Sequence, residues 1–243
     1  MAEEPPAQPN TGRAHRILDA AGELLLSWGY KRVTVEDVAH RAGVGKGTVY
    51  LHWRTKNDLF AALLMREGAA VLAEQLEAMR ADPAEVTLHR NLRSMFLIVM
   101  RRPLARAFYT GDTDLLGKLC TDTKIGLQAQ QDKRAMVPQY HTVLRSHGML
   151  RPQGDQRTLS YALHAATAGF FLLERAPFTD EGLSLEDKAD ALAATIRNAF
   201  EPTEPPSAAQ LAAAAPEVIA LYKQLLADLT RHLPNEDRTD ITA

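Results

Sequence analysis

Apolar residues recur along this chain at the spacing of helices. Thr11 or Gly12 begins a stretch in which they return every three or four positions up to Trp28, and Gly29 then ends it, which predicts a first helix. The apolar members of this stripe are Ile17, Leu18, Ala21, Leu24, Leu25 and Trp28.

Two much shorter periodic stretches follow. Thr34 and Asp37 are spaced as a helix-capping pair, and Gly43 suits the left-handed residue that ends a helix. A second short helix is expected from Lys46 to Trp53, with Val49 facing inward one turn before Trp53.

The rest of the chain has the same helical pattern, broken at prolines and glycines. Pro216 leaves open whether the last helix starts at residue 208 or at this proline. We find no alternating strand pattern bounded by hairpin turns. The fold class is therefore predicted to be all-α, with further helices at about 57–80, 84–100, 104–109, 113–146 (interrupted near Pro138), 155–175, 185–199 and 208–232.

These breaks divide the chain into an N-terminal three-helix unit and a larger helical body. The helix at 57–80 is long enough to run from one unit into the other. The expected segments are a disordered arm at 1–10, the three-helix unit at 11–66, the body at 67–200, a proline-rich linker at 201–207, a C-terminal helix at 208–233 and a disordered tail at 234–243.

The two short helices form a recognisable pair. A tight turn containing Gly43 and Gly45 joins them, and the second helix has an apolar stripe on one side and hydrogen-bond donors on the other. This arrangement is typical of a helix-turn-helix whose second helix can enter the major groove of DNA. The donors are Lys46, Thr48, Tyr50 and His52.

The stretch from Thr34 to Leu59 resembles the DNA-binding domain of the TetR family of transcriptional regulators. Two departures, Trp53 in place of Phe and Thr55 in place of Ser or Asn, keep the chemistry of the motif. The motif residues present are Thr34, Val38, Ala39, Ala42, Gly43, Val44, Gly45, Lys46, Gly47, Thr48, Val49, Tyr50, His52, Trp53, Lys56 and Leu59. The resemblance covers about residues 12–66.

The resemblance implies roles for single residues. Thr48, Tyr50 and Lys56 are expected to contact phosphate, whereas Lys46 and Gly47 approach base edges. His52 would contact backbone or base, and Thr34 completes the set of DNA-binding candidates. The residue types agree, because hydroxyl and ammonium groups donate to phosphate oxygens and a glycine lets the backbone come close. The alternative for each is an ordinary exposed helix residue.

The net charge of the whole chain does not suggest DNA binding, but the charge of the N-terminal unit does. The net charge is −2, but residues 11–66 carry nine Lys or Arg against five Asp or Glu. Phosphate neutralisation needs such a local excess of positive charge. The hydrophobic share of 46% and the charged share of 24% are those of a globular protein.

Composition also bears on location and partners. One cysteine, Cys120, permits no internal disulfide, and we read it as a small buried side chain rather than a sensor. No apolar run approaches the length of a membrane span, and the acidic, proline-rich first ten residues do not resemble a signal peptide. We therefore expect a cytoplasmic protein without a membrane partner.

Catalytic and metal-binding patterns are absent from the sequence, so no catalytic residue, cofactor or metal is assigned. The string GVGKGT suggests a phosphate-binding loop, but Gly47 separates Lys46 from Thr48 and a helix precedes it, which argues against that loop. The remaining polar candidates lack ligand spacing; they are Asp112, Asp114, His141, His147 and His164.

The resemblance implies that the body dimerises and binds an effector. The helices at 155–175 and 185–200 are rich in small and apolar residues, which suits a four-helix bundle between two subunits, although both could be intrachain core. The expected interface residues are Leu159, Leu163, Ala166, Phe170, Leu173, Leu192 and Ile196.

For an effector pocket the candidates are aromatic residues and methionines of the body, with tyrosine hydroxyls or His164 as orienting groups. Most such residues in a helical domain are simply core. The candidates are Phe96, Met100, Phe108, Tyr109, Met136, Tyr140, Tyr161, His164 and Phe171.

The sequence thus favours a homodimeric regulator that binds a palindromic operator in double-stranded DNA and is a repressor released by an unknown small-molecule effector. Two alternatives stay open. One is a DNA-binding regulator without a ligand, which a body without a cavity would favour. The other is a ligand carrier or enzyme on the same helical fold, which failure to bind DNA would favour.

Overall fold

The computed structural model describes residues 11–117, 119, 136–152, 155–176, 182–231 and 233. The predicted arm at 1–10, the predicted tail at 234–243 and Cys120 lie outside them. Every regular element in this described part is a helix, so the all-α prediction is confirmed. None of these helices is long and apolar enough to cross a lipid bilayer.

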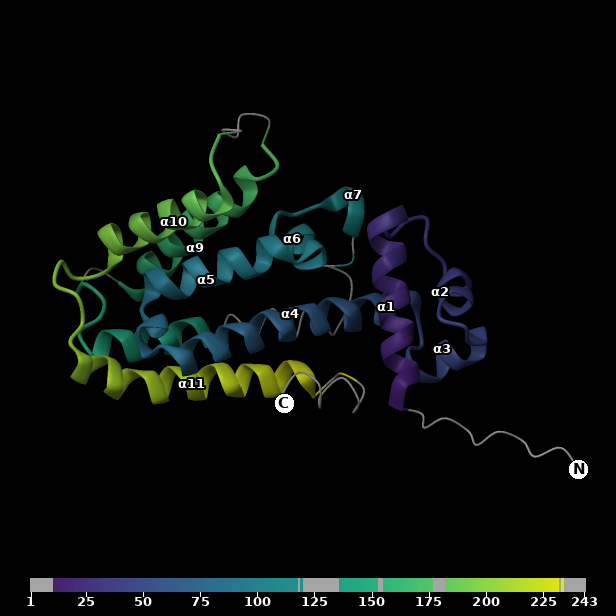
Figure 1. The fold of residues 1–243 in the computed structure, drawn as a ribbon, viewed down its shortest axis with the longest axis horizontal. Helices are drawn as coiled ribbons and strands as arrows, with labels where there is room; N and C mark the ends of the chain where they lie inside the picture. Colours follow the sequence, from purple (N-terminus) through teal and green to yellow (C-terminus); the bar gives the residue numbers. More distant parts are fainter. Residues whose placement is uncertain are drawn as a thin grey trace, which may run out of the picture.

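The first three helices form the N-terminal unit seen at one end of the molecule in Figure 1. They are α1 (Thr11–Trp28), α2 (Val35–Arg41) and α3 (Lys46–His52). The Thr34 hydroxyl accepts from the Asp37 N–H, while the Asp37 carboxylate accepts from the Thr34 N–H, so the predicted capping pair is confirmed. Gly43 ends α2 with φ +67°, a conformation that glycine adopts without strain.

The fourth helix, α4 (Lys56–Ala81), leaves this unit and runs the length of the body (Figure 1). It begins with a second capping box, between Thr55 and Asp58. Its first turns bury Leu59 and Leu63 in one hydrophobic core, and its later turns bury Leu72 and Leu76 in another. One helix therefore contributes to the cores of both ends of the molecule.

The region predicted as one helix at 84–100 is two elements. A short 3-10 helix, η1 (Pro83–Val86), precedes α5 (Leu88–Arg101), and Thr87 between them is extended with ψ 147°. The Asp82 carboxylate accepts from the Ala84 N–H and tightens this first turn. The prediction missed the break because no glycine or internal proline marks it.

The predicted helix at 113–146 is also wrong. After α6 (Pro103–Tyr109), α7 comprises only Thr113–Leu116, and Gly117 ends it with φ +57°. Residues 136–146 are helical, so Pro138 lies inside a helix and does not interrupt it. The break at Gly117, within the described residues, accompanies a tertiary hydrogen bond from the Tyr30 N–H to the Leu115 carbonyl.

The last three helices cover the body. They are α9 (Gln156–Leu173), α10 (Leu185–Phe200) and α11 (Ala208–Thr230). In Figure 1 α10 packs beside α5 and α9, while α11 lies along α4 on the opposite side.

Ser207 caps α11 through the Gln210 N–H, so this helix starts at Ala208 and contains Pro216. The segment 201–207, predicted as a linker, begins with a buried residue. Glu201 is 5% exposed and accepts from the His89 N–H at 2.9 Å. The segment 201–207 is therefore anchored to the body at its first residue.

Buried apolar side chains form two clusters. The N-terminal cluster takes residues from α1 to the start of α4, and also Leu104 and Ala107 of α6 and Leu116 of α7. The body cluster extends from Ala69 of α4 to Leu229 of α11. The clusters thus meet along α4 near residue 66, and α6 and α7 add a second junction between them.

Replacing Thr55 with Ala should lower the free energy of unfolding by about 1 kcal/mol, because the N-cap bond of α4 would be lost. Urea denaturation followed by circular dichroism measures this change. Thr195→Ala is the matched control, since Thr195 is exposed within α10 and should change stability by less than about 0.5 kcal/mol. Equal losses in the two variants would contradict a capping role for Thr55.

Candidate nucleic-acid interface and body cavity

The α3 helix is held by its apolar side against the rest of the N-terminal unit. Val49 is 1% exposed and Trp53, which follows the helix, is 6% exposed. Because these two side chains fix the inward side, residues on the other side of α3 must point away from the protein. The face so defined, which we call the α3 outer face, comprises Lys46, Gly47, Tyr50 and Leu51.

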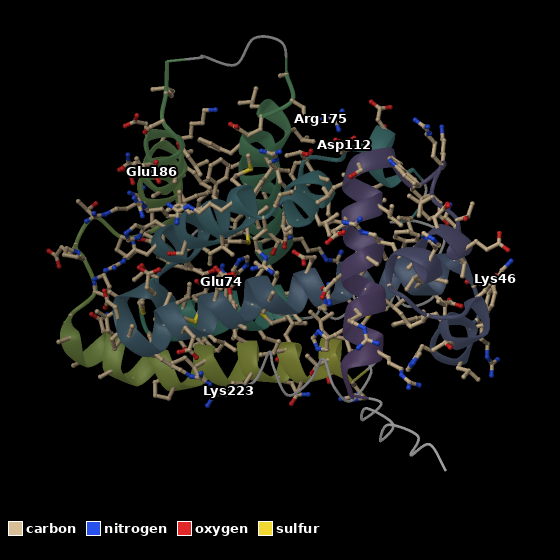
Figure 2. The ribbon with its side chains drawn as sticks, turned by 45° about the vertical axis from the view of Figure 1, so that its right-hand side comes forward. Lys46, Glu74, Asp112, Arg175, Glu186 and Lys223 are labelled. Carbon is tan, nitrogen blue, oxygen red and sulfur yellow. The ribbon has the colours of Figure 1, made fainter. Side chains whose placement is uncertain are left out.

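Three predicted DNA-binding residues lie on this outer face. The Lys46 ammonium forms an exposed ion pair with Glu36 at 2.7 Å and stands at the outer edge of the molecule (Figure 2). Tyr50 is 44% exposed. Apart from its chain neighbours and the backbone of its own helix, no atom lies within 4 Å of a Cβ built on Gly47, so the fold does not need a glycine there. The backbone of Gly47 is open to close approach by another molecule.

The other predicted contacts lie at the border of this face or behind it. Thr48 and His52 are half-buried at its sides, and the His52 ring packs 5.3 Å from that of Trp53. Thr34 is exposed at the start of α2, where its hydroxyl is used in the capping box.

Lys56 is the exception, because its ammonium group has partners inside the protein. It donates to the Tyr30 carbonyl and lies 4.1 Å from the centre of the Tyr30 ring. Burial lowers the pKa of Lys56, although the nearby Asp37 opposes the shift. The structure therefore does not place Lys56 with the other donors.

Leu51 is the residue that the sequence analysis missed. It is 86% exposed in the middle of the outer face, and nothing in the described chain covers it. Val49 and Trp53, four residues apart, define the inward side of this segment. Leu51 lies midway between them and therefore on the opposite side, so its exposure could have been predicted from their spacing. An exposed leucine can contact the methyl group of thymine in a major groove.

The body contains a cavity of about 340 Å³ between α4, α5, α6, residues 136–141, α9 and α11. Its walls are mainly apolar, with a few polar groups, as in small-molecule sites. Six of the nine predicted pocket residues line it: Phe108, Tyr109, Met136, Tyr140, His164 and Phe171.

The other three do not line this cavity. Phe96 is fully buried behind it and packs against Phe171 with ring centres 5.1 Å apart. Met100 packs at the edge of the body cluster. Tyr161 is 77% exposed because it lies on the outward side of α9. Composition alone could not separate pocket, core and surface positions on these helices.

Several polar groups of the cavity are satisfied within the protein. Asn91 accepts from the Tyr222 hydroxyl at 2.8 Å, and the Tyr140 hydroxyl donates to the Val86 carbonyl at 3.0 Å. By contrast, His141 is 2% exposed and its Nδ1 has no hydrogen-bond partner among the described residues. The hydroxyl of Thr167 is buried and unpartnered in the same way.

The predicted interface residues divide into two groups. Leu163, Leu192 and Ile196 are buried in the body cluster, which corrects their assignment to a subunit interface. Leu159, Ala166 and Phe170 are half-buried, and Leu173 is 44% exposed. The most exposed large apolar side chains on α9 are instead Tyr161 and Leu172, at 77% and 55%.

Among the described residues no three His, Cys, Asp or Glu side chains come together as metal ligands. Of the polar candidates, Asp112 caps α7 and pairs at 2.6 Å with Arg175, which follows the end of α9 (Figure 2). Asp114 lies 3.7 Å from the same arginine. His147 pairs with Glu217 at 2.9 Å. These contacts join helices to one another.

Comparison with known proteins was made on sequence and on structure. Residues 17–63 match the family described as bacterial regulatory proteins, tetR family. A helix-turn-helix transcriptional regulator of Mycobacterium bovis is 34% identical over 101 residues, which cover 39% of this chain and 53% of that protein. The transcriptional activator FasR of Mycolicibacterium smegmatis is 32% identical over 72 residues, covering 30% and 33%. The chain thus spans about half the length, or less, of these curated relatives.

Solved structures share the fold at lower identity. NalD, the secondary repressor of the MexAB-OprM multidrug efflux pump in Pseudomonas aeruginosa, has a TM-score of 0.56 at 22% identity, covering 82% of this chain and 100% of NalD. SmeT, the repressor of the SmeDEF multidrug efflux pump of Stenotrophomonas maltophilia, has a TM-score of 0.52 at 19% identity, covering 80% and 94%.

Acid should destabilise the protein through His141. Burial lowers the pKa of His141 from 6.5 to about 4, with further contributions from His164 and Arg145. Between these two values the unfolded chain binds a proton that the folded chain does not, so stability is full above pH 6.5 and falls toward pH 4. The expected loss is on the order of 3 kcal/mol.

The measurement is the free energy of unfolding of the wild type and of His141→Gln across this pH range. The difference between the two proteins cancels the titration of all other groups. We expect the free energy of unfolding of His141→Gln to fall less than that of the wild type as the pH is lowered. Parallel pH profiles for the two proteins would contradict a buried neutral His141.

Proposed function

This chain belongs to the TetR family of transcriptional regulators through its N-terminal helix-turn-helix, and from that premise we propose that it is a homodimeric repressor released by a small molecule. A palindromic site in double-stranded DNA would bind the two α3 helices. An effector in the body cavity would lower this affinity. The observation that carries the proposal is α4, which lines the cavity through Gln75 and supports the helix-turn-helix through Leu59.

The α3 outer face supports the proposed DNA contact. It presents the ammonium group of Lys46, the phenol of Tyr50 and the exposed backbone of Gly47. It also presents the exposed side chain of Leu51, while the buried Val49 and Trp53 anchor the segment. We assign Tyr50 and Thr48 to phosphates, and Lys46, Gly47 and Leu51 to base edges. Glu36 must release Lys46 on binding, which costs little because surface ion pairs are weak.

Lys56 takes a different part in the proposal. Its ammonium group holds the Tyr30 carbonyl, so it positions the start of α4 against the loop after α1. We therefore assign Lys56 to positioning of the helix-turn-helix rather than to a direct phosphate contact.

Two routes connect the cavity to the DNA-binding end. The first is α4, whose Gly68, Val71 and Leu72 line the cavity. The second is α6, because Phe108 and Tyr109 line the cavity while Ala107, on the same helix, packs in the N-terminal cluster. A ligand that prefers one position of α4 and α6 by a few kcal/mol would change operator affinity correspondingly.

The outward side of α9 supports dimerisation. Tyr161, Ala165 and Leu172 are exposed at helical spacing, and Ala191 and Ala194 are exposed on α10. An apolar face next to small residues suits a helix bundle between subunits. A palindromic operator also requires two α3 helices about 34–36 Å apart.

Repression is the mode we propose, since two structural neighbours, NalD and SmeT, are named as repressors. FasR, a relative in the DNA-binding region, is named as an activator, so activation is the second candidate. The cavity favours a ligand-responsive regulator over one without a ligand. We also propose a cytoplasmic location, since the protein would act on DNA. The proposed units are 11–66 for DNA binding and 67–200 for the ligand and the dimer.

Selection of duplexes from a random pool by the full-length protein should enrich a palindrome. Lys46→Ala and Leu51→Ala should each weaken binding by about 1–3 kcal/mol and relax preference at single base pairs. Tyr50→Phe should weaken binding to all sequences by about 1 kcal/mol, because a phosphate contact carries no sequence information.

The matched control for Lys46→Ala is Lys223→Ala, an exposed lysine on α11 far from α3 (Figure 2). It should leave affinity and preference unchanged. The DNA-binding proposal fails if no sequence is enriched at low salt. The assignment of single residues fails if the α3 variants behave like Lys223→Ala.

Leu172→Glu should convert the protein to a monomer and lower operator affinity at least about tenfold, because charge would be buried in the proposed α9 face. Sedimentation velocity measures the oligomeric state, and titration of a labelled operator measures affinity. Leu26→Glu changes a leucine of similar exposure, 42%, on α1 and should leave the dimer intact. A dimeric Leu172→Glu protein would rule out this face.

A further inference from the structure

Two buried polar atoms at the body cavity have no partner within the described protein. His141, on the helical stretch 136–146, is 2% exposed, and its Nδ1 has no hydrogen bond to any described residue. Thr167 of α9 has a buried hydroxyl that is unpartnered in the same way. Both residues line the cavity, and polar atoms buried in native proteins are nearly always paired. These two atoms are therefore available to a polar group of a bound molecule.

His141 and Thr167 lie at the same part of the cavity. His164 precedes Thr167 by one helical turn on α9, and both line the cavity, so they share one side of that helix. Burial is the main cause of the low pKa of His141, about 4, and the next cause is the charge of His164. Such an interaction requires the two rings to be near each other. One small molecule lying along this side of α9 is thus within reach of both unpartnered atoms.

Other polar side chains of the cavity have partners within the protein. Asn91 accepts from the Tyr222 hydroxyl at 2.8 Å and from Gln75 at 3.4 Å. The Tyr140 hydroxyl donates to the Val86 carbonyl at 3.0 Å. The remaining walls are mainly apolar, and the volume of about 340 Å³ is at the small end of the range for ligand sites. A compact apolar molecule with one polar end matches such a cavity.

The described walls of the cavity offer no partner to a charged ligand. No Asp, Glu, Lys or Arg is among the described residues that line it, and Arg145, whose charge also lowers the pKa of His141, is not one of them. With a pKa of about 4, the His141 ring is neutral at neutral pH. Burying a carboxylate or an ammonium group without a partner of opposite charge is costly. The cavity therefore disfavours charged ligands of either sign.

The two unpartnered atoms also indicate the type of polar group. A neutral imidazole nitrogen either donates or accepts a hydrogen bond, depending on the tautomer, whereas a threonine hydroxyl does both. A ligand hydroxyl can donate and accept at once, so it can bond to His141 in either tautomer and to Thr167. A carbonyl or ether oxygen can only accept, and it suits fewer of these combinations.

On the premise that this cavity is the effector site of the proposed function, we propose that its ligand is an uncharged, largely apolar molecule that carries a hydroxyl group. The hydroxyl forms hydrogen bonds with Nδ1 of His141 and with the hydroxyl of Thr167. The apolar part lies among Val71, Leu72 and Leu92, which line the cavity from α4 and α5. Each hydrogen bond is neutral, so it adds modest affinity but discriminates against molecules that leave the buried atoms unpaired.

The test compares four molecules of similar length: octan-1-ol, its isomer 1-methoxyheptane, octanoate and octylammonium. Isothermal titration calorimetry on the full-length protein at neutral pH should show octan-1-ol binding at least about threefold more tightly than 1-methoxyheptane, because only the alcohol can donate a hydrogen bond. Octanoate and octylammonium should each bind at least about tenfold more weakly than octan-1-ol, because their charge would be buried unpaired.

Thr167→Val and His141→Phe then remove one unpartnered group each. Each should bring the affinities of octan-1-ol and 1-methoxyheptane closer together, and the double variant should bring them to within about twofold. Without ligand, neither variant should melt at a lower temperature than the wild type, because no hydrogen bond within the described protein is lost. Thr142→Val is the matched control: its exposed hydroxyl donates to the Pro138 carbonyl outside the cavity, and its loss should leave the affinity ratio unchanged.

Four results would overturn the proposal. They are absence of octan-1-ol binding, equal affinities of octan-1-ol and 1-methoxyheptane for the wild type, octanoate or octylammonium binding as tightly as octan-1-ol, and an unchanged ratio in both Thr167→Val and His141→Phe. Circular dichroism melting confirms that each variant is folded. Thr167→Val, which keeps the shape of the side chain, keeps the test decisive if His141→Phe does not fold.

Operator binding in the same preparations separates this inference from the proposed function. Octan-1-ol that binds with the expected preference but leaves operator affinity unchanged would support the ligand class and refute the cavity as the effector site. Specific operator binding without any binding of octan-1-ol would leave the regulator intact and overturn the ligand class. Failure to bind DNA at all would refute the regulator, and the ratio of alcohol to ether affinity would still decide the ligand class.

Discussion

The continuity of α4 is the constraint on which the rest of this structure depends. Its first turns bury Leu59 and Leu63 in the N-terminal cluster, and its later turns bury Leu72 and Leu76 in the body cluster. Because cores are closely packed, neither end of this helix can shift without moving the side chains around it. The two ends of the molecule are therefore mechanically joined without a flexible linker between them.

The sequence was sufficient for most helices and for the helix-turn-helix, because those features depend on local signals. Capping at Thr34 and Thr55, the positive φ of Gly43 and the inward pair Val49 and Trp53 all act within a few residues. The sequence analysis did not predict the break at Thr87 or the end of α7 at Gly117. The first has no sequence marker, and the second accompanies a long-range hydrogen bond between Tyr30 and Leu115.

Sites within the body were harder to predict, because α9 is apolar on more than one side. Leu163 and Phe171 point into the body, whereas Tyr161 and Leu172 point outward, and all four are equally plausible as pocket, core or interface from periodicity alone. Which side faces inward is decided by packing on α10, the next helix in the chain, and on α6, which is distant in sequence. The unpartnered atoms of His141 and Thr167 could not be foreseen at all, since they follow from which neighbours are missing.

Tyr30 shows how the second junction reaches the helix-turn-helix. Its N–H donates to the carbonyl of Leu115 in α7, and its own carbonyl accepts from Lys56 at the start of α4. Its ring packs 5.4 Å from that of Phe60. A shift of α6 at the cavity would thus act on the same first turn of α4 that a shift of α4 itself would move. Because both routes meet there, the base of α4 is where movement in the body would be converted into a new position of α3.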